Sequence, residues 1–160
     1  ETTGILLIAK NRNYAQLFTS LFRLRKIKKI YLGIVCGEFY NKKGKFEDIL
    51  YHYENEKRIS SKAITYYEVI DSNKGYSLLK LIPYTGRKHQ LRKQLSIRNH
   101  FIIGDKKYAS HDKNIKKNSK LMLHAYKISF TINNLQYNFS AKIPKDFEYT
   151  IKKKYLKNVL

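Results

Sequence analysis

The chain has 160 residues, of which 42% are hydrophobic and 14% aromatic, so it can bury the core of one domain and is not a disordered basic tail. Its 33 lysines and arginines against 12 acidic residues give a net charge of +21, which attracts polyanions, although a general lysine bias also contributes. Cys36 is the only cysteine, which excludes an internal disulfide, and we expect its thiol to be buried. With no signal peptide and no apolar run of bilayer-spanning length, the sequence predicts a cytoplasmic protein that does not act at a membrane.

The spacing of apolar residues predicts mostly strands, with helices between and after them. In chain order we expect a strand at 4–9, a helix at 13–25, strands at 28–38, 63–70 and 75–84, a helix at 87–98, a hairpin of 121–132 with 135–143, and a basic helix at 145–156. Residues 41–48, around Gly44, and the lysine-rich residues 106–120 are predicted loops. Short turns between successive strands imply one α+β domain over residues 1–160, with a mixed, largely antiparallel sheet and a few flanking helices.

The stretch TGRKHQLRKQL, from Thr85 to Leu95, carries five basic or histidine side chains and no carboxylate at the start of a predicted helix. One explanation is contact with a nucleic-acid backbone. Another is a buried carboxylate that needs an arginine partner. No residue of the sequence is identified as that carboxylate, and the two explanations are compatible. The five histidines have no ligand spacing with one another or with Cys36, so we expect no metal site.

Four stretches together resemble the RluA/RluC/RluD-type RNA pseudouridine synthases. They are ETTGILLIAKN, which is similar to the end of the family's His-Arg-Leu-Asp motif, then KKIYLGIVCGE, TGRKHQLR, and IIGDKKYA followed by LMLHA. Their order matches from Glu1 to about Pro144. The family's catalytic aspartate falls about two residues before the position of Glu1. The resemblance therefore implies the C-terminal portion of a pseudouridine synthase catalytic domain that lacks its nucleophile and is inactive alone.

The resemblance implies that the full-length protein isomerises uridine to pseudouridine in RNA, most simply in large-subunit ribosomal RNA, as a monomer and without a cofactor. The alternative is a non-enzymatic RNA-binding or ribosome-assembly module. The two are distinguished by whether an in-frame His-Arg-Leu-Asp precedes Glu1.

The same resemblance assigns roles to individual side chains. Arg92 is the expected partner of the catalytic aspartate, and Tyr31 is the expected contact of the flipped uracil. From the residues alone, the favoured interpretation of Arg92 is a surface cation on a basic helix, and that of Tyr31 is a cross-strand aromatic; the other motifs favour the site roles instead. Leu91 is expected to line the uracil pocket or to be plain core. The remaining expected substrate-binding residues are Lys29, Arg87, Lys88, His89 and Gln90. Asp105 and His124 are expected to be structural.

Overall fold

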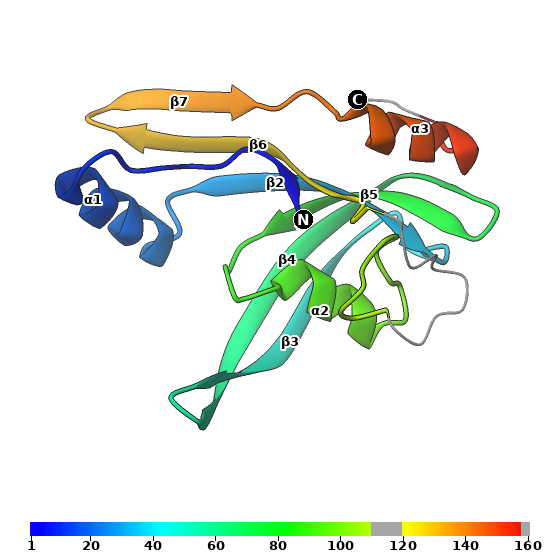
Figure 1. The fold of residues 1–160 in the computed structure, drawn as a ribbon, viewed down its shortest axis with the longest axis horizontal. Helices are drawn as coiled ribbons and strands as arrows, with labels where there is room; N and C mark the ends of the chain where they lie inside the picture. The colour runs from blue at the N-terminus through cyan, green and yellow to red at the C-terminus, as the bar shows by residue number, and fades with distance from the viewer. Residues whose placement is uncertain (110–119, 158–160) are drawn as a thin grey trace.

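The computed structural model describes residues 1–109 and 120–157, which form a seven-stranded sheet with three helices (Figure 1). The helices are α1 (Arg12–Arg23), α2 (Gln90–Ile97) and α3 (Lys145–Lys153). The strands are β1 (Thr3–Gly4), β2 (Lys28–Cys36), β3 (Lys43–Glu54), β4 (Lys57–Asn73), β5 (Tyr76–Pro83), β6 (Leu123–Ile132) and β7 (Leu135–Ser140). Their order in the sheet is β1-β6-β2-β5-β4-β3, and β7 pairs with β6. Only the β1–β6 pair is parallel among these strands, which confirms the predicted α+β class with a largely antiparallel sheet.

The core is centred on β2 and β5, where runs of consecutive residues are buried. Because successive strand residues point to opposite faces, such runs show that both faces of the sheet are covered there. Leu91 and Leu95 of α2 and Phe147 and Ile151 of α3 join this core. A second, smaller cluster lies under α1 and consists of Leu21, Ile27, Ile128 and Phe130. Each predicted helix is thus found, and each covers part of the sheet.

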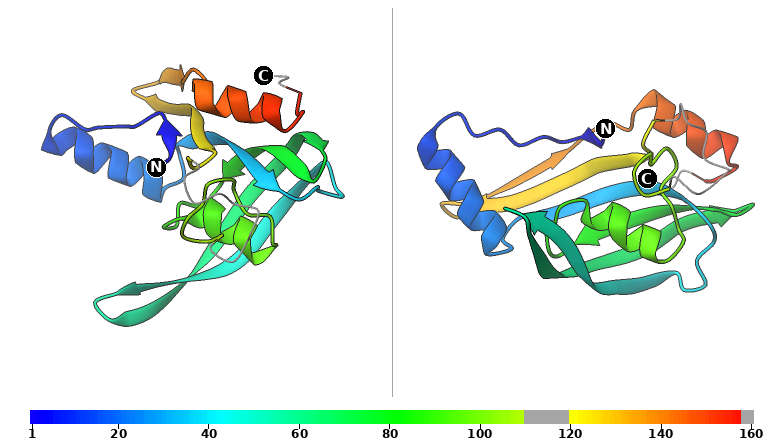
Figure 2. Two further views of the ribbon diagram at one scale, coloured as in Figure 1. Left: turned by 45° about the vertical axis from the view of Figure 1, so that its right-hand side comes forward. Right: turned by 60° about the horizontal axis from the view of Figure 1, so that its bottom comes forward.

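The prediction of a loop at residues 41–48 is wrong, because β3 begins at Lys43 and pairs with β4 along twelve residues. Phe46 and Leu50 are buried while the residues beside them are exposed or half-exposed, which is the pattern of a half-buried strand. Asn55 and Glu56 close the hairpin, both with positive φ, as a tight two-residue turn requires. We call residues 47–62 the arm, because this end of the hairpin extends away from the rest of the sheet (Figures 1 and 2).

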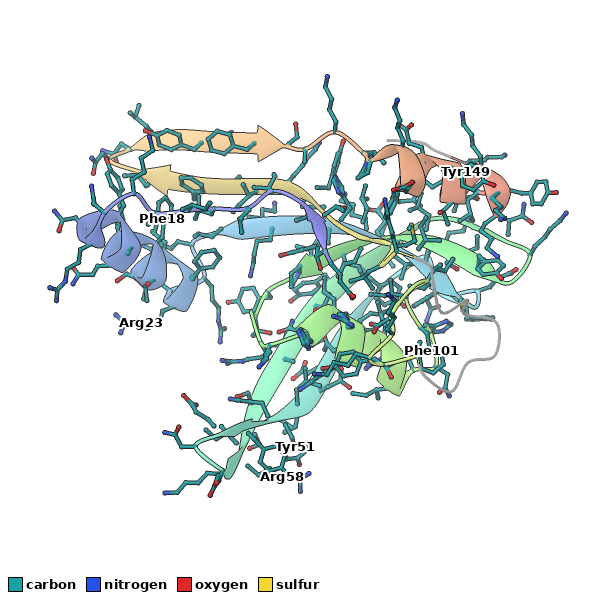
Figure 3. The ribbon with its side chains drawn as sticks, viewed as in Figure 1. Phe18, Arg23, Tyr51, Arg58, Phe101 and Tyr149 are labelled. Carbon is teal, nitrogen blue, oxygen red and sulfur yellow. The ribbon has the colours of Figure 1, made fainter. Side chains whose placement is uncertain are left out.

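The arm carries aromatic and basic side chains near its end. Figure 3 shows Tyr51 and Arg58 there, and the guanidinium carbon of Arg58 lies 3.9 Å from the centroid of the Tyr51 ring. Tyr53 is 75% exposed. The arm therefore presents a stacked cation and aromatic pair to solvent.

The buried strand predicted at residues 4–9 is also wrong, since β1 consists of Thr3 and Gly4 alone. β1 pairs with β6 at His124 and Ala125, and from Lys127 onward β7 occupies that same edge of β6. After Ile5, whose N–H bonds to Ala125 O, residues 6–9 have no edge of β6 left to pair with, and Leu6 and Ile8 are 79% and 74% exposed.

Two smaller expectations have mixed outcomes. Cys36, expected to be buried, is only partly buried at the end of β2. Most of the predicted loop 106–120 lies outside the described residues. No helix in the described parts of the chain combines the length and the apolar composition that a membrane span needs.

Candidate functional site

A cleft of about 810 Å³ opens where the N-terminal segment, β2, the end of β5, the start of α2 and β6 meet. A cleft of this size is typical of small-molecule and nucleotide sites. Its described lining residues are Glu1, Thr2, Thr3, Gly4, Ile5, Leu6, Lys29, Tyr31, Pro83, Thr85, Gly86, Arg87, His89, Gln90, Leu91, Arg92, Leu123 and Ala125. The sheet thus brings together segments that lie far apart in the sequence.

All but one of the expected site residues line this cleft. The residues brought together are Lys29, Tyr31, Arg87, His89, Gln90, Leu91 and Arg92. Lys88 is exposed and does not line it. The cleft also contains residues that the sequence did not indicate, namely Thr85 and the β6 residues Leu123 and Ala125. The four-residue spacing of Leu91 and Leu95 indicated an apolar helix face, but no sequence pattern indicated which strands lie opposite it.

Arg92 has a carboxylate partner within the chain, although the sequence had not identified one. Its Nε donates to Asp105 Oδ2 at 2.8 Å and its Nη2 donates to Oδ1 at 2.7 Å, a two-bond fork. The side chains are 12% and 2% exposed respectively. The pair uses Nε and Nη2, and Nη1 of Arg92 has no acceptor among the described residues, so it can bond to a second acceptor at the cleft.

The loop that carries Asp105 is built around this pair. The backbone N–H groups of Lys107 and Tyr108 donate to Asp105 Oδ1 at 3.0 and 2.9 Å. Tyr108 in turn lies with its ring centroid 5.2 Å from the Arg92 guanidinium, and its hydroxyl is 2.9 Å from His89 Nδ1. Asp105 is structural in this sense, as expected, since it orients Arg92. Tyr108 was missed as a site residue, although the Asp-x-x-Tyr spacing in the sequence carried the signal.

Charges and burial shift the pKa values in this cluster. Burial pushes the pKa of Asp105 up, but the hydrogen bonds from Arg92, Tyr108 and Lys107 outweigh it, so the pKa is lowered. The hydrogen bond to Asp105 raises the pKa of Arg92. Burial, followed by the charges of Arg92 and nearby lysines, lowers the pKa of His89. The cluster therefore holds an ionised carboxylate, a fixed guanidinium and a neutral imidazole near pH 7.

Tyr31 and Lys29 project from β2 toward the cleft, two residues apart and thus on the same face of the strand. Tyr31 is opposite Leu81 on one side and Ala125 on the other, both of them apolar, and it lines the cleft. Burial raises the pKa of the Tyr31 hydroxyl and lowers that of the Lys29 ammonium. No carboxylate in the described residues forms an ion pair with Lys29, so a half-buried ammonium faces the cleft without an anionic partner.

The start of α2 is held by the side chain of Gln90. Its Nε2 donates to Ile64 O at 3.0 Å, and its Oε1 accepts from the backbone N–H of Arg87 at 3.0 Å. His89, the residue before the helix, has a left-handed backbone (φ 54°) and makes no capping side-chain bond. Leu91, 7% exposed, then points its apolar side chain at the cleft and at the core, so both roles expected for it are compatible.

β1 forms the wall opposite α2. Thr3 Oγ1 and His124 Nδ1 are 2.9 Å apart, and Ile5 N donates to Ala125 O at 2.9 Å. His124 is 1% exposed and was expected to be a structural strand histidine. Its burial lowers its pKa. Its Nε2 is buried without a hydrogen-bond partner in the described structure; the Ala141 backbone lies near enough to favour protonation but not in bonding geometry.

The backbone of β1 approaches β6 very closely. A Cβ built on Gly4 (φ +104°) would lie 2.3 Å from Ala125 O. Only glycine combines this positive φ with such an approach, which explains the Thr-Gly pair at the edge of the cleft.

The cleft is electropositive. Of its described lining residues Lys29, Arg87 and Arg92 are cationic and Glu1 is the only carboxylate. This arrangement attracts an anionic ligand. The described residues include no group of three or more His, Cys, Asp or Glu side chains placed to hold a metal ion.

Comparisons with known proteins point to one family. A family model described as RNA pseudouridylate synthase matches residues 1–97. The chain is 34% identical over 155 residues to the "Ribosomal large subunit pseudouridine synthase D" of Borreliella burgdorferi, covering 92% of this chain and 47% of that protein. It is 33% identical over 153 residues to the "tRNA pseudouridine synthase C" of Haemophilus ducreyi, covering 81% of this chain and 63% of that protein.

A solved structure, Human RNA Pseudouridylate Synthase Domain Containing 4, has the same fold. It superposes with a TM-score of 0.78 at 23% sequence identity, covering 92% of this chain and 70% of that one. The chain spans about half the length of the Borreliella relative and less than two thirds of the Haemophilus one.

Proposed function

The chain belongs to the RNA pseudouridylate synthase family, and from this premise we propose that the full-length protein isomerises uridine to pseudouridine in RNA. We further propose large-subunit ribosomal RNA as the substrate, the RNA for which the Borreliella relative is named. In this proposal residues 1–160 are the C-terminal portion of the catalytic domain. The reaction breaks the N1–C1′ bond of uridine, turns the uracil, and forms a C5–C1′ bond. C5 loses a proton and N1 gains one, so nothing is consumed.

The observation that carries the proposal is the environment of Arg92. A guanidinium on a side chain that is only 12% exposed, held by Asp105 on one edge and still lining the cleft, is prepared for a second anion. We assign that anion to the nucleophilic carboxylate, on residues that precede Glu1 in the full-length protein. The charge of Glu1 contributes to the raised pKa of Arg92, which supports the view that the N-terminal segment approaches Arg92. Arg92 would keep the carboxylate ionised and aimed at the ribose.

Tyr31 and Leu91 would hold the uracil. A base must leave its stack to be turned over, and it needs an aromatic or apolar surface in its new place. The ring of Tyr31 offers a face for stacking and Leu91 an apolar wall. The raised pKa keeps the Tyr31 hydroxyl protonated at neutral pH, so it can donate a hydrogen bond to the base and relay the C5 proton.

The cations around the cleft would bind the RNA backbone. Lys29 has no anionic partner among the described residues, and a phosphate would compensate its burial. Arg87 is exposed at the rim with its Nε donating to Lys62 O at 3.2 Å, which leaves its Nη groups for a phosphate. Lys88 is exposed outside the cleft and can contact RNA only beyond the flipped nucleotide.

One observation favours the alternative, an RNA-binding or ribosome-assembly module without catalysis. Glu1 is the only carboxylate among the described residues that line the cleft, and Asp105 is already occupied by Arg92 and two backbone N–H groups. Neither is placed as a nucleophile, so activity depends on a carboxylate beyond residues 1–160.

The test compares the full-length protein with residues 1–160 alone, each incubated with unmodified large-subunit ribosomal RNA. Pseudouridine is read by carbodiimide treatment and primer extension. We expect modification at a discrete uridine by the full-length protein, and RNA binding without modification by residues 1–160. RNA binding without pseudouridine by either protein, on ribosomal and transfer RNA, would favour the binding module. Turnover by residues 1–160 would refute a nucleophile upstream of Glu1.

A further inference from the structure

A chain of buried polar side chains connects the arm to the cleft. It begins at Asp48 on β3 and continues through Gln94 of α2 and Thr65 of β4 to Gln90 and Thr85. The side chains of Thr65, Gln90, Gln94 and Thr85 are at most 4% exposed. Of the chain, only Gln90 and Thr85 line the cleft; Asp48, Gln94 and Thr65 do not.

Each hydrogen bond in this series of side chains has a fixed donor and a fixed acceptor. Gln94 Nε2 donates to Asp48 Oδ2 at 2.8 Å, because a carboxylate can only accept. Gln94 Oε1 then accepts from the Thr65 hydroxyl at 2.6 Å. The Thr65 oxygen is left to accept from Gln90 Nε2, at 2.9 Å. The orientation of each amide is therefore fixed by its neighbour.

This hydrogen-bonded series of side chains ends at the cleft, where the donors and acceptors are again fixed. Gln90 Oε1 accepts from the Thr85 hydroxyl at 2.7 Å and from the backbone N–H of Arg87 at 3.0 Å. The Thr85 oxygen accepts from Ile64 N at 2.8 Å. A change at Gln94 thus leaves the buried Thr65 hydroxyl without its acceptor, next to Gln90, which lines the cleft.

The arm also contacts α2 at two further points. Arg98, the C-cap of α2, forms a two-bond ion pair with Asp48 at 2.9 and 3.1 Å. Lys93 Nζ donates to Tyr51 O at 2.6 Å. Because α2 is only eight residues long and has no capping side-chain bond at its start, these contacts add to the packing of Leu91 and Leu95 in holding it on the sheet. Leu91 and Arg92 belong to this helix, so the position of the helix determines theirs.

We propose that Asp48, Gln94 and Thr65 are positioning residues for the cleft, which act through the buried polar chain to set where α2 presents Leu91 and Arg92. This role presupposes the proposed function, with α2 as one wall of the uridine site. The arm is then part of the catalytic scaffold. A displacement of well under a helical turn at α2 would misalign the guanidinium with the carboxylate that it orients, and misplacement by about 1 Å can cost about 100-fold in rate.

The test uses Thr65→Val in the full-length protein, a nearly isosteric change that removes one hydroxyl from the middle of the chain. Gln94→Met is the stronger variant and Gln16→Met, at an exposed position on α1, is its matched control. Single-turnover rates at saturating ribosomal RNA and RNA dissociation constants are measured where circular dichroism shows each variant folded. We expect Thr65→Val to lower the rate at least about 10-fold with an RNA affinity within about twofold of wild type, and Gln16→Met to change neither.

Two variants, alone and combined, test directly which group of each hydrogen bond is the donor and which is the acceptor. Gln94→Glu places two carboxylates against each other and should lower the rate more than Gln94→Met. Adding Asp48→Asn restores a donor opposite residue 94 and keeps one acceptor for Arg98, while the bond from residue 94 to Ala63 O stays lost. The double variant should therefore recover part of the rate, not all of it. Failure of Asp48→Asn to recover any of the rate would overturn the assigned polarity.

A second readout does not depend on turnover. Hydrogen exchange read by mass spectrometry should show faster exchange over residues 85–98 in Thr65→Val, and unchanged exchange in Gln16→Met. Wild-type protein that makes no pseudouridine would count against the proposed function, while the exchange result still decides the positioning role. If Thr65→Val has the same single-turnover rate and the same hydrogen exchange as the wild-type protein, the positioning role is overturned and the proposed function stands.

Discussion

Arg92 illustrates how much a single side chain depends on its fixed partner. Two of its nitrogens are committed to Asp105, whose oxygens also accept two backbone N–H bonds. This arrangement removes the rotational freedom that a long side chain usually has. The guanidinium can therefore act on a second anion without first being ordered.

Arg92→Met should lower the free energy of unfolding by about 3–5 kcal/mol, because Asp105, 2% exposed, is left as an unpaired buried charge. Asp105→Asn in the same background removes that charge, so the double variant should lose less stability than the two single variants added together. Urea denaturation of the three variants measures the coupling. Strictly additive losses would contradict a functional ion pair.

In the full-length protein Arg92→Met should lower the single-turnover rate by more than about tenfold, while RNA affinity changes little. One charge removed from a net charge of +21 barely alters the attraction to a polyanion. Arg92→Lys should restore the rate only in part, since an ammonium cannot form the planar fork. Arg12→Met is the control, because Arg12 is exposed at the start of α1 and does not line the cleft. Equal small effects at both positions would make Arg92 an ordinary surface cation.

His124 should make stability depend on pH. Its buried ring has a pKa below the usual 6.5 in the folded protein. The unfolded chain therefore binds a proton first as the pH falls, so stability present above pH 6.5 is lost as the pH decreases through and below this value. His124→Asn keeps a polar atom near Thr3 and should flatten the decline between pH 7.5 and about 5.5, as measured by urea denaturation. An unchanged slope would show that other groups cause the decline.

At the scale of elements, α1 has a well-defined start. Asn11 Oδ1 accepts from Tyr14 N at 3.0 Å, and the helix packs over the smaller apolar cluster. Asn11→Ala should therefore cost about 1 kcal/mol of stability. Asn13 is exposed in the first turn of the helix, two residues after the cap. Asn13→Ala should be neutral or slightly stabilising, because alanine has the higher helix propensity. Thermal unfolding followed by circular dichroism compares the two, and similar losses would mean that Asn11 is no cap.

The elements that sequence predicted correctly are those with complete local patterns. Helices at 13–25 and 87–98 and the hairpin across Asn133 and Asn134 needed only periodicity and turn chemistry. The strand at 4–9 failed because β7 competes for the edge of β6, and a single run of residues cannot show that competition. β3 was missed because its polar residues and Gly44 read as a loop, while its pairing with β4 supplies the order.

The residues of the cleft were predictable to a similar extent. Residues 87 and 89–92 are neighbours in sequence, so one motif was enough to group them. The partner of Arg92 was not predictable, because Asp105 lies in a separate loop and only the fold brings it within 2.8 Å. The buried series of polar side chains from Asp48 to Thr85 connects β3, β4 and the end of β5 to α2. Because its members lie far apart in the sequence, no local sequence pattern indicated it.

At the scale of the whole molecule, the positive charge should make RNA binding depend on salt. Each neutralised single-strand phosphate contributes a slope of about −0.7 in log K against log salt. Lys29→Met should reduce the slope by about one such unit, because Lys29 faces the cleft without an anionic partner in the described structure. Lys43→Met removes the same charge from a residue paired with Glu68 at 3.0 Å and should change the slope less. Equal changes in filter-binding titrations would mean that only net charge matters.

The cleft is assembled from segments at both ends of the chain, and this has a consequence for synthesis. Thr3 and His124, which join β1 to β6, are 121 positions apart, whereas the arm pairs residues close in sequence. Contacts of long range form late, since the entropy of closing the intervening loop opposes them. During translation the arm can form while β6 is still untranslated, but the wall of the cleft cannot exist until residue 125 has left the ribosome. A chain that ends before residue 125 therefore lacks the β6 side of the cleft.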